Sequence, residues 1–256
     1  TLFPFTTLFR SISFTLVIYY RLTLLPIIHF KFECCLMTRQ FCIYLLLICT
    51  LTSCFEVIED ITFKKDGSGT FKFIINLSQS KSEVNSLMKL DSASGYKIPR
   101  VNDINTILDQ VTRTLKTTEG ISNVNLKRNY TDWIFELKMD FKNTQSLDAA
   151  VTNLYADLSG GREIEYKNTI NYANNTFTRD VQLPDEDAKK EINKPVGKRI
   201  FASAKFTTIY RFEKEVSKQT NAKAKVSASK KAVMLQGNVL NILNGKEPIK
   251  NTIYLH

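Results

Sequence analysis

The chain has 256 residues, of which 43% are hydrophobic and 23% are charged, with nine glycines and six prolines. This composition is typical of a folded protein and excludes a collagen-like, low-complexity or disordered chain. Its 35 lysines and arginines exceed its 25 acidic residues, which gives a net charge of +10 at pH 7.

The cysteines and histidines are confined to the ends of the chain. None of the five cysteines lies beyond Cys54, and the two histidines are His29 and His256. Residues 55–255 therefore contain neither a thiol nor an imidazole. In this long segment the sequence excludes a disulfide framework, a Cys/His zinc site and a catalytic triad that uses Cys or His. We predict no metal and no cofactor.

Residues 1–36 are hydrophobic but irregular. They start at Thr1, contain no methionine and are interrupted by Arg10 and Arg21. No stretch among them approaches the ~20 consecutive apolar residues that a membrane helix needs. We expect residues 1–36 to be an upstream extension that is not made in the cell. The alternative is a hydrophobic segment that precedes a signal peptide.

Residues 37–53 have the three parts of a secretory signal peptide. Met37 and Arg39 open a short basic region, residues 41–51 form an uncharged apolar run, and small residues follow. The apolar run is too short to span a bilayer, as is usual for a signal peptide. We predict that this segment is removed and that the mature protein comprises residues 54–256.

The sequence Leu51-Thr52-Ser53-Cys54 resembles the lipobox of bacterial lipoproteins. The resemblance implies that a signal peptidase recognises the first three residues and cuts before Cys54. The thiol of Cys54 would then carry a lipid, and its new amino group would be acylated. Several acyl chains on one residue anchor a protein stably to a membrane. The alternative is a cysteine that merely follows an ordinary signal peptide.

Apolar periodicity in residues 54–256 predicts a single globular α+β domain. The first elements are a strand hairpin over 57–63 and 71–77 with a turn at 65–69, a short helix near 84–88, a helix over 101–115, strands over 121–126 and 133–141, a helix over 144–158, and a hairpin over 162–172 and 176–181. Between Phe71 and Tyr172 the order is β, α, β, β, α, β. This order indicates a ferredoxin-like core, with two helices on one face of an antiparallel sheet.

The remaining segments are expected to complete this domain. Residues 54–60 should act partly as a tether, and Leu158 should point inward from the helix over 144–158. C-terminal to the core we predict a charged helix over 185–193, a long strand over 202–216, a hairpin over 223–228 and 232–235, and a terminal strand over 249–255. These C-terminal strands are expected to extend the sheet or to cover it.

Residues 54–256 stay basic, with 31 basic and 24 acidic residues and a net charge of +7. We interpret this charge as a solvated surface near anionic membrane lipid. The basic residues are not interleaved with aromatic residues and match no nucleic-acid-binding motif, so no nucleic-acid partner is predicted.

Carboxylates are the only catalytic side chains that the body retains. Glu163 and Glu165 share one face of a predicted strand, as the carboxylates of a glycosidase might. We interpret this pair as part of a solvated face, because the other strands also alternate polar residues outward. Two further carboxylate clusters are Glu59-Asp60 and Asp185-Glu186-Asp187, and the second of these resembles the acidic first turn of a helix. We predict no catalytic residue. The alternative is a carboxylate-dependent envelope hydrolase that uses Glu163 and Glu165.

Aromatic residues are numerous for a small sheet, and we expect them to pack in the core. The alternative is that some of them line a cleft for a lipid or another amphipathic ligand. The residues concerned are Trp133, Phe135, Tyr166, Tyr172, Phe206, Tyr210 and Phe212.

Three features occur in the order known from a group of exported proteins: Cys54, the turn Asp66–Gly69, and the strand that ends at Val216. In this order the chain is similar to LppM-like exported bacterial lipoproteins, and it looks still more like uncharacterised lipoproteins of Bacteroidetes. The strand has Phe212-Glu213-Lys214-Glu215 where the LppM-like group carries a Pro-Gly pair. The resemblance implies an envelope lipoprotein with a lipid or glycolipid ligand and no catalytic residues.

The residues after Cys54 indicate where in the cell envelope the protein is anchored. Phe55 is not the aspartate of inner-membrane retention, and Glu56, Glu59 and Asp60 do not form the tight acidic cluster of surface export. We therefore expect a non-enzymatic protein that Cys54 anchors in the outer membrane, facing the periplasm. It would bind a lipid or an envelope protein, or serve as a structural component of an envelope complex. The sequence leaves the oligomeric state open.

Overall fold

The computed structural model describes residues 55–256 other than 94, 159–169, 181–183 and 185. The described residues belong to one unit, Ser53–His256. The predicted signal peptide and most of the predicted strand over 162–172 lie outside the described residues. Within the described part of the chain, no helix is long and apolar enough to cross a membrane.

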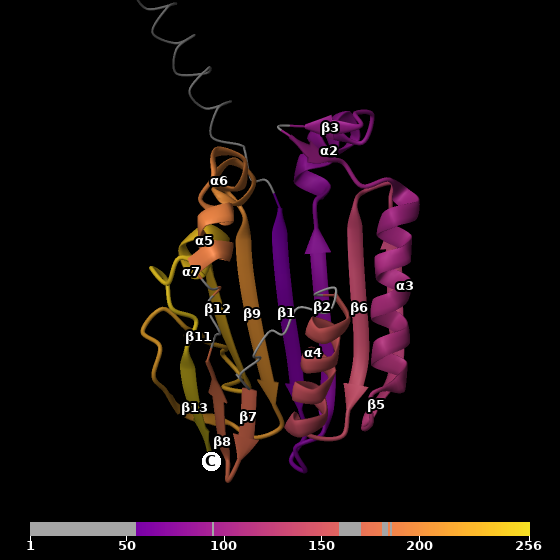
Figure 1. The fold of residues 1–256 in the computed structure, drawn as a ribbon. Coiled ribbons are helices and arrows are strands. Elements are labelled where there is room, and N and C mark those ends of the chain that lie inside the picture. The colour runs from indigo at the N-terminus through magenta and orange to yellow at the C-terminus, as the bar shows by residue number, and fades with distance from the viewer. Residues whose placement is uncertain (1–54, 94, 159–169, 181–183, 185) are drawn as a thin grey trace, which may run out of the picture. The chain divides into compact units, whose positions relative to one another are not determined.

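The first sheet has seven strands, in the order β11-β12-β9-β1-β2-β6-β5 (Figure 1). The strands are β1 (Glu56–Phe63), β2 (Gly69–Asn76), β5 (Ile121–Asn129), β6 (Ile134–Phe141), β9 (Lys205–Phe212), β11 (Lys225–Val226) and β12 (Ala232–Asn238). Neighbouring strands are antiparallel, apart from the parallel pair of β1 and β9. In that pair, residues 149 positions apart in sequence lie side by side, because Val57 pairs with Phe206.

A second sheet has four antiparallel strands, in the order β10-β13-β8-β7. Its strands are β7 (Ile170–Ala173), β8 (Thr176–Arg179), β10 (Val216–Gln219) and β13 (Asn251–Leu255). The β7–β8 turn consists of Asn174 and Asn175, which both have positive φ angles. This turn type matches the twist of a hairpin, and asparagine tolerates its backbone conformation.

The helices fall between the strands. They are η1 (Ser78–Ser80), α2 (Lys81–Leu87), α3 (Val101–Thr117), α4 (Thr144–Leu158), α5 (Glu186–Ile192), α6 (Pro195–Phe201) and α7 (Val239–Leu243), and a small ribbon of β3 (Ser92–Ala93) and β4 (Tyr96–Lys97) follows α2. The Asp103 carboxylate accepts a hydrogen bond from the backbone N–H of Arg100 at 2.8 Å, which caps the start of α3. Pro195 occupies the first turn of α6, where no hydrogen-bond donor is required.

The core lies on one face of the first sheet, which we call the inner face. Strand pairing places Ile61, Phe71 and Met139 side by side on this face. Helices α3 and α4 cover it with Leu115 and Leu147, and the second sheet covers it with other buried side chains. The opposite face is more polar and carries ion pairs such as Arg211–Asp60 and Lys72–Glu136. Each strand is therefore apolar toward the helices and largely polar on the other side.

The α+β class is confirmed, and the predicted order of elements holds. In a ferredoxin-like sheet the last strand would lie beside β2, but here β1 occupies that place and β7 pairs with β8 in the second sheet. The β1–β2 hairpin closes over only five residues, so this local pairing costs little loop entropy. The predicted C-terminal hairpin is also confirmed, and β11 and β12 extend the first sheet as expected.

Two other predictions are wrong. Residues 56–60 are not a tether, because they belong to β1 and pair with β2 on one side and β9 on the other. Residues 202–204 do not begin the long strand, because α6 occupies 195–201 and β9 starts at Lys205.

Candidate functional site

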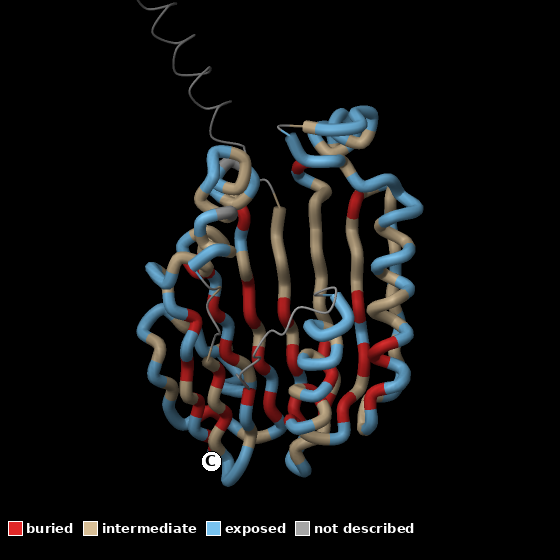
Figure 2. Tube along the Cα trace, in the orientation of Figure 1, coloured by how far each residue is buried: buried red, intermediate tan, exposed pale blue. Residues whose placement is uncertain are grey.

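The inner face is unevenly covered along the strands. We call the end of the first sheet where β1 begins the proximal end, and the end where β1 stops the distal end. Toward the distal end Ile61 and Phe63 have no exposed surface. Toward the proximal end several apolar side chains on the same face stay half-buried (Figure 2). We call this group the open half: Val57, Phe73, Ile75, Phe135 and Phe206. Within it, Phe73 also packs against the main core, and Phe206 packs against a smaller buried cluster of Leu235, Ile242 and Ile249.

The path of α4 explains the difference. It begins at Thr144, shortly after β6 ends at the distal end, and buries Leu147 and Ala150 there. Leu154 is only partly buried, and Leu158 is 48% exposed although its helical spacing predicted an inward position. The second sheet also covers the distal part, where the ring of Phe177 lies 5.2 Å from that of Phe63.

A buried polar network marks the boundary between the two parts of the inner face. Its members are Glu59 of β1, Arg179 of β8 and Tyr210 of β9, so it joins both sheets. The guanidinium Nη2 of Arg179 donates to Oε2 of Glu59 at 3.1 Å, and the Tyr210 hydroxyl donates to Oε1 at 3.0 Å. Arg179 Nε also donates to the Tyr210 hydroxyl oxygen at 3.2 Å. Each carboxylate oxygen thus has a donor.

Burial sets the chemistry of this network. The Glu59 and Arg179 side chains are only 8% and 10% exposed. Burial, followed by the negative charge of Glu59, holds the pKa of Tyr210 far above its ordinary value. The phenol therefore stays protonated and remains a donor to the carboxylate. A paired carboxylate with both oxygens occupied is poorly placed to act as a general base, so the network is better suited to fixing a charge pair beside an apolar surface.

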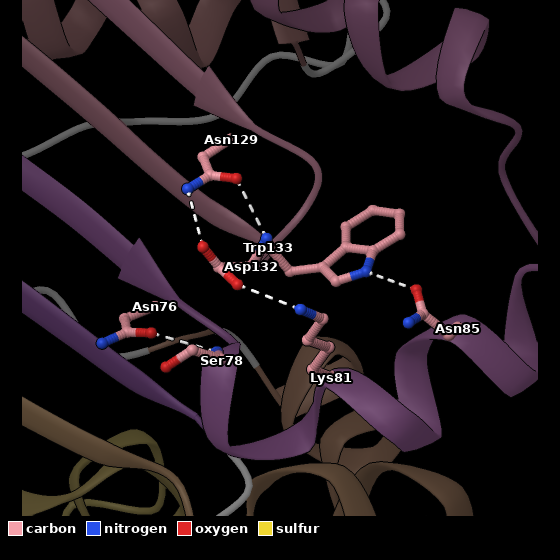
Figure 3. A network of polar contacts seen from close by, with 7 residues as sticks. All are labelled: Asn76, Ser78, Lys81, Asn85, Asn129, Asp132 and Trp133. Atoms are coloured by element: carbon pink, nitrogen blue, oxygen red, sulfur yellow. Dashed lines mark hydrogen bonds and ion pairs between the residues drawn. The ribbon is translucent and has the colours of Figure 1, made fainter.

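The proximal border of the open half is a corner built around Trp133 (Figure 3). Trp133 has a positive φ of 55°, which a bulky residue rarely adopts. Its indole N–H donates to Oδ1 of Asn85 at 2.8 Å, and its backbone carbonyl accepts a hydrogen bond from Leu77 at 2.9 Å. The rings of Tyr130 and Phe135 lie 5.6 Å and 6.5 Å from its own. These contacts stabilise the unusual conformation.

Asp132 ties the same corner to α2. Its Oδ1 accepts a hydrogen bond from Nζ of Lys81 at 3.0 Å, and its Oδ2 accepts one from Asn129 at 3.1 Å. The bond from Lys81 lowers the pKa of the Asp132 carboxyl below its ordinary value, and the bond from Asn129 adds to this effect. The corner is consequently fixed from both the β5–β6 turn and α2.

The structure describes only some of the residues that the sequence predicts to be functional. Cys54, Leu51, Thr52 and Ser53 lie outside the described residues, so the lipid attachment site stays a prediction. The same holds for the carboxylate pair Glu163 and Glu165, for Tyr166 and for Asp185.

Two of the predicted clusters fall within the described residues. Glu59 and Asp60 point to opposite faces, since Asp60 forms an ion pair with Arg211 while Glu59 is buried. In the first turn of α5, Glu186 and Asp187 pair with lysines of the same helix, as expected of an acidic first turn.

The expectation for the aromatic residues is confirmed in part. Tyr210 and Phe212 belong to the core, whereas Phe135 and Phe206 lie in the open half. Sequence reasoning missed the buried network, although one signal was present. Glu59 occupies an inward position in the alternation of Val57, Ile61 and Phe63, and a charged residue there needs a buried partner.

In the described part of the chain, no three His, Cys, Asp or Glu side chains come together to hold a metal ion.

No protein-family model matches the sequence. No curated protein matches it either. Among solved structures, the folded domain of the Mycobacterium tuberculosis protein LppM aligns with a TM-score of 0.38 and 11% identity, covering 79% of this chain and 90% of that one.

Proposed function

We propose that the chain is a lipid-anchored protein of the bacterial cell envelope whose body binds an amphipathic ligand without transforming it. The observation that carries the proposal is the open half. Its five apolar side chains continue the core face, remain half-buried, and end at the charged pair of Glu59 and Arg179. An apolar surface with a small number of placed polar groups is the usual composition of a site for a small molecule.

Burial energetics support a ligand at this surface. A Phe or Ile side chain gains about 1.5–3 kcal/mol when it moves from water to full burial. Phe135 and Ile75 are only half-buried, so an acyl chain that covers them would recover part of that energy. The polar end of such a molecule would lie beside the buried charge pair of Glu59 and Arg179, whose hydrogen bonds are made within the protein and whose charges would orient it.

The anchor in this proposal is Cys54. The lipobox sequence supports it, and β1 begins only two residues later. The test is intact-mass analysis of the full-length chain after expression in a bacterium. We expect a product that begins at an acylated Cys54 and fractionates with the outer membrane, whereas a Cys54→Ser variant should be neither cut nor acylated. An unmodified chain that begins before Met37 would contradict the anchor.

The ligand is tested with two neighbouring isoleucines. Ile75 lies in the open half, and Ile74 lies on the opposite face of the same strand with similar burial. We expect mass spectrometry of organic extracts to find a lipid on the purified wild-type protein and on Ile74→Asn, but not on Ile75→Asn. Equal lipid on both variants, or none on the wild-type protein, would contradict the proposed site.

A further inference from the structure

The connections at the proximal end of the first sheet form a surface that the ligand site does not use. Three of them run from β2 to α3 (77–100), from β5 to β6 (130–133) and from α5 to β9 (193–204), whereas a fourth, after β12, begins with α7. Together the first three contain seven basic and three acidic residues, so they hold a net charge of +4 out of the +7 of residues 54–256. Figure 1 shows α2 and the β3–β4 ribbon at this end beside the start of α3, and α6 at the opposite side of the same end.

Large apolar side chains are exposed on the same surface. Leu87, Leu90, Tyr96 and Ile200 are 41–47% exposed, and Val101 at the start of α3 is 38% exposed. Isolated exposed apolar residues are common on proteins, but several on the same surface indicate an interaction site. Exposed apolar groups that alternate with basic ones are typical of a surface that enters the headgroup region of a membrane.

Hydrogen bonds and ring contacts join the parts of this surface to one another and to the sheet, where Lys81 and Asn85 of α2 bond to Asp132 and Trp133. Nη1 of Arg100 donates to the carbonyl of Met88 at 3.1 Å, which joins the start of α3 to the residue after α2. The rings of Phe55 and Phe201 lie 6.1 Å apart, edge to face, and join α6 to the start of β1. The exposed side chains are therefore presented by an ordered platform.

We propose that the proximal end docks onto the anionic bilayer in which Cys54 is anchored. This inference rests on the lipid anchor of the proposed function. Two residues of extended chain span about 7 Å at most, so an acylated Cys54 holds Glu56 and the proximal end beside the headgroups. Basic side chains within a Debye length of about 8 Å are attracted to anionic lipid. Leu87, Leu90 and Ile200 would then insert between the headgroups.

A protein partner is the other occupant to consider for such a surface. The bilayer is favoured because the anchor keeps it within reach and because the surface is positively charged, which complements anionic lipid. A protein occupant remains an outcome of the test.

Trp133 is the single tryptophan of the sequence and lies at the proximal end, so its fluorescence reports on docking without any substitution. The acylated chain is extracted from cells and reconstituted into phosphatidylglycerol–phosphatidylcholine vesicles that contain a lipid with a nitroxide on its headgroup. We expect the nitroxide to quench Trp133. In vesicles of phosphatidylcholine alone the quenching should be weaker.

Charge reversal at either end provides the matched comparison. The triple variant Lys89→Glu, Lys97→Glu, Lys198→Glu should lose most of the quenching. The distal variant Lys64→Glu, Lys65→Glu, Lys231→Glu changes the net charge equally and should keep it. Equal quenching in both variants, or an unquenched Trp133 in the acylated wild-type chain, would overturn the docking surface. So would quenching that appears only when a second protein is added.

The docking surface and the anchor fail in different ways. An acylated chain with an unquenched Trp133 keeps the anchor and refutes the surface. A chain that lacks the acyl groups but shows charge-dependent quenching refutes the anchor and supports the surface.

Discussion

The two ends of the seven-stranded sheet share the same strands but are connected in different ways. At the distal end the connections have two to five residues and contain no Leu, Ile, Val, Met, Phe, Tyr or Trp: 64–68, 118–120, 142–143, 174–175, 213–215 and 227–231. At the proximal end the connections reach 24 residues and carry exposed apolar and basic side chains. The distal turns are short and polar, whereas the proximal connections from β2 to α3 and from α5 to β9 contain the helices α2 and α6.

The inner face follows the same division. Its distal part is the main buried core, and its proximal part is the open half, which borders the smaller buried cluster of Leu235, Ile242 and Ile249. The most deeply buried residues are therefore concentrated toward one end of the strands, and the residues of the proposed ligand site lie toward the other. The buried pair of Glu59 and Arg179 lies where the two parts meet.

The largest difference should appear when phenylalanines of the two parts are truncated. Phe63 is fully buried, and its ring lies 5.1–5.8 Å from four other aromatic rings. Phe63→Ala should lower the free energy of unfolding by about 3–5 kcal/mol. Phe135→Ala in the open half should cost about 1–2 kcal/mol, because less area is buried there. Urea unfolding followed by Trp133 fluorescence measures both, and equal losses would refute the division.

The adjacent carboxylates Glu59 and Asp60 sharpen the comparison across the sheet. Glu59→Gln leaves the guanidinium of Arg179 buried without a compensating charge, which should cost about 3 kcal/mol. Asp60→Asn removes a partly exposed pair with Arg211 and should cost about 0.5 kcal/mol. The same urea experiment separates the two. A larger loss for Asp60→Asn would mean that the buried network contributes little.

Glycines at the two ends should tolerate a methyl group differently. A Cβ on Gly69, at the distal end, would meet the carbonyl oxygen of Thr62 at 2.0 Å and the ring of Phe141 at 2.5 Å. Gly69→Ala should thus cost about 1–3 kcal/mol through overpacking. Gly95, at the proximal end, has open space around it, and only its φ of 84° opposes a substitution. Gly95→Ala should cost about 1 kcal/mol, as measured by the shift in thermal unfolding.

The smallest expected effect is a pH dependence confined to the proximal corner. The folded-state pKa of Asp132 is lowered, so this carboxylate stabilises the corner at pH values above its unfolded pKa of about 3.9. The stabilisation is lost as the pH falls through the lower folded pKa. The emission of Trp133 should accordingly change below about pH 4. A Lys81→Met variant removes the hydrogen bond that lowers the pKa, and its change should occur at a higher pH.

Local features of this fold were predictable from the sequence. The spacing of apolar residues predicted α4 over 144–158 and the start of α3. The Gly-containing turn at 65–69 and the asparagine pair at 174–175 predicted two hairpins, because few residues adopt these backbone conformations. In each case the signal lies within a few residues of the element that it determines.

Long-range features were not predictable in the same way. The parallel pairing of β1 with β9 joins residues 149 positions apart, and the partner of Glu59 is Arg179, 120 residues away. No local pattern near Glu56 indicates a strand partner that is so distant in sequence. The sequence therefore favours a tether over residues 54–60, where the structure has β1. β7 belongs to the second sheet because it pairs with β8, and β8 pairs in turn with β13. No local pattern in the sequence links β8 with β13.

The most direct test of the central claim compares amide hydrogen exchange of the acylated chain on anionic and on uncharged vesicles. We expect the anionic surface to slow exchange in residues 81–100 and 195–201 and to leave the distal turns at 64–68 and 227–231 unchanged. Slower exchange at the distal turns, or no difference between the two ends, would contradict the assignment of the proximal end to the membrane.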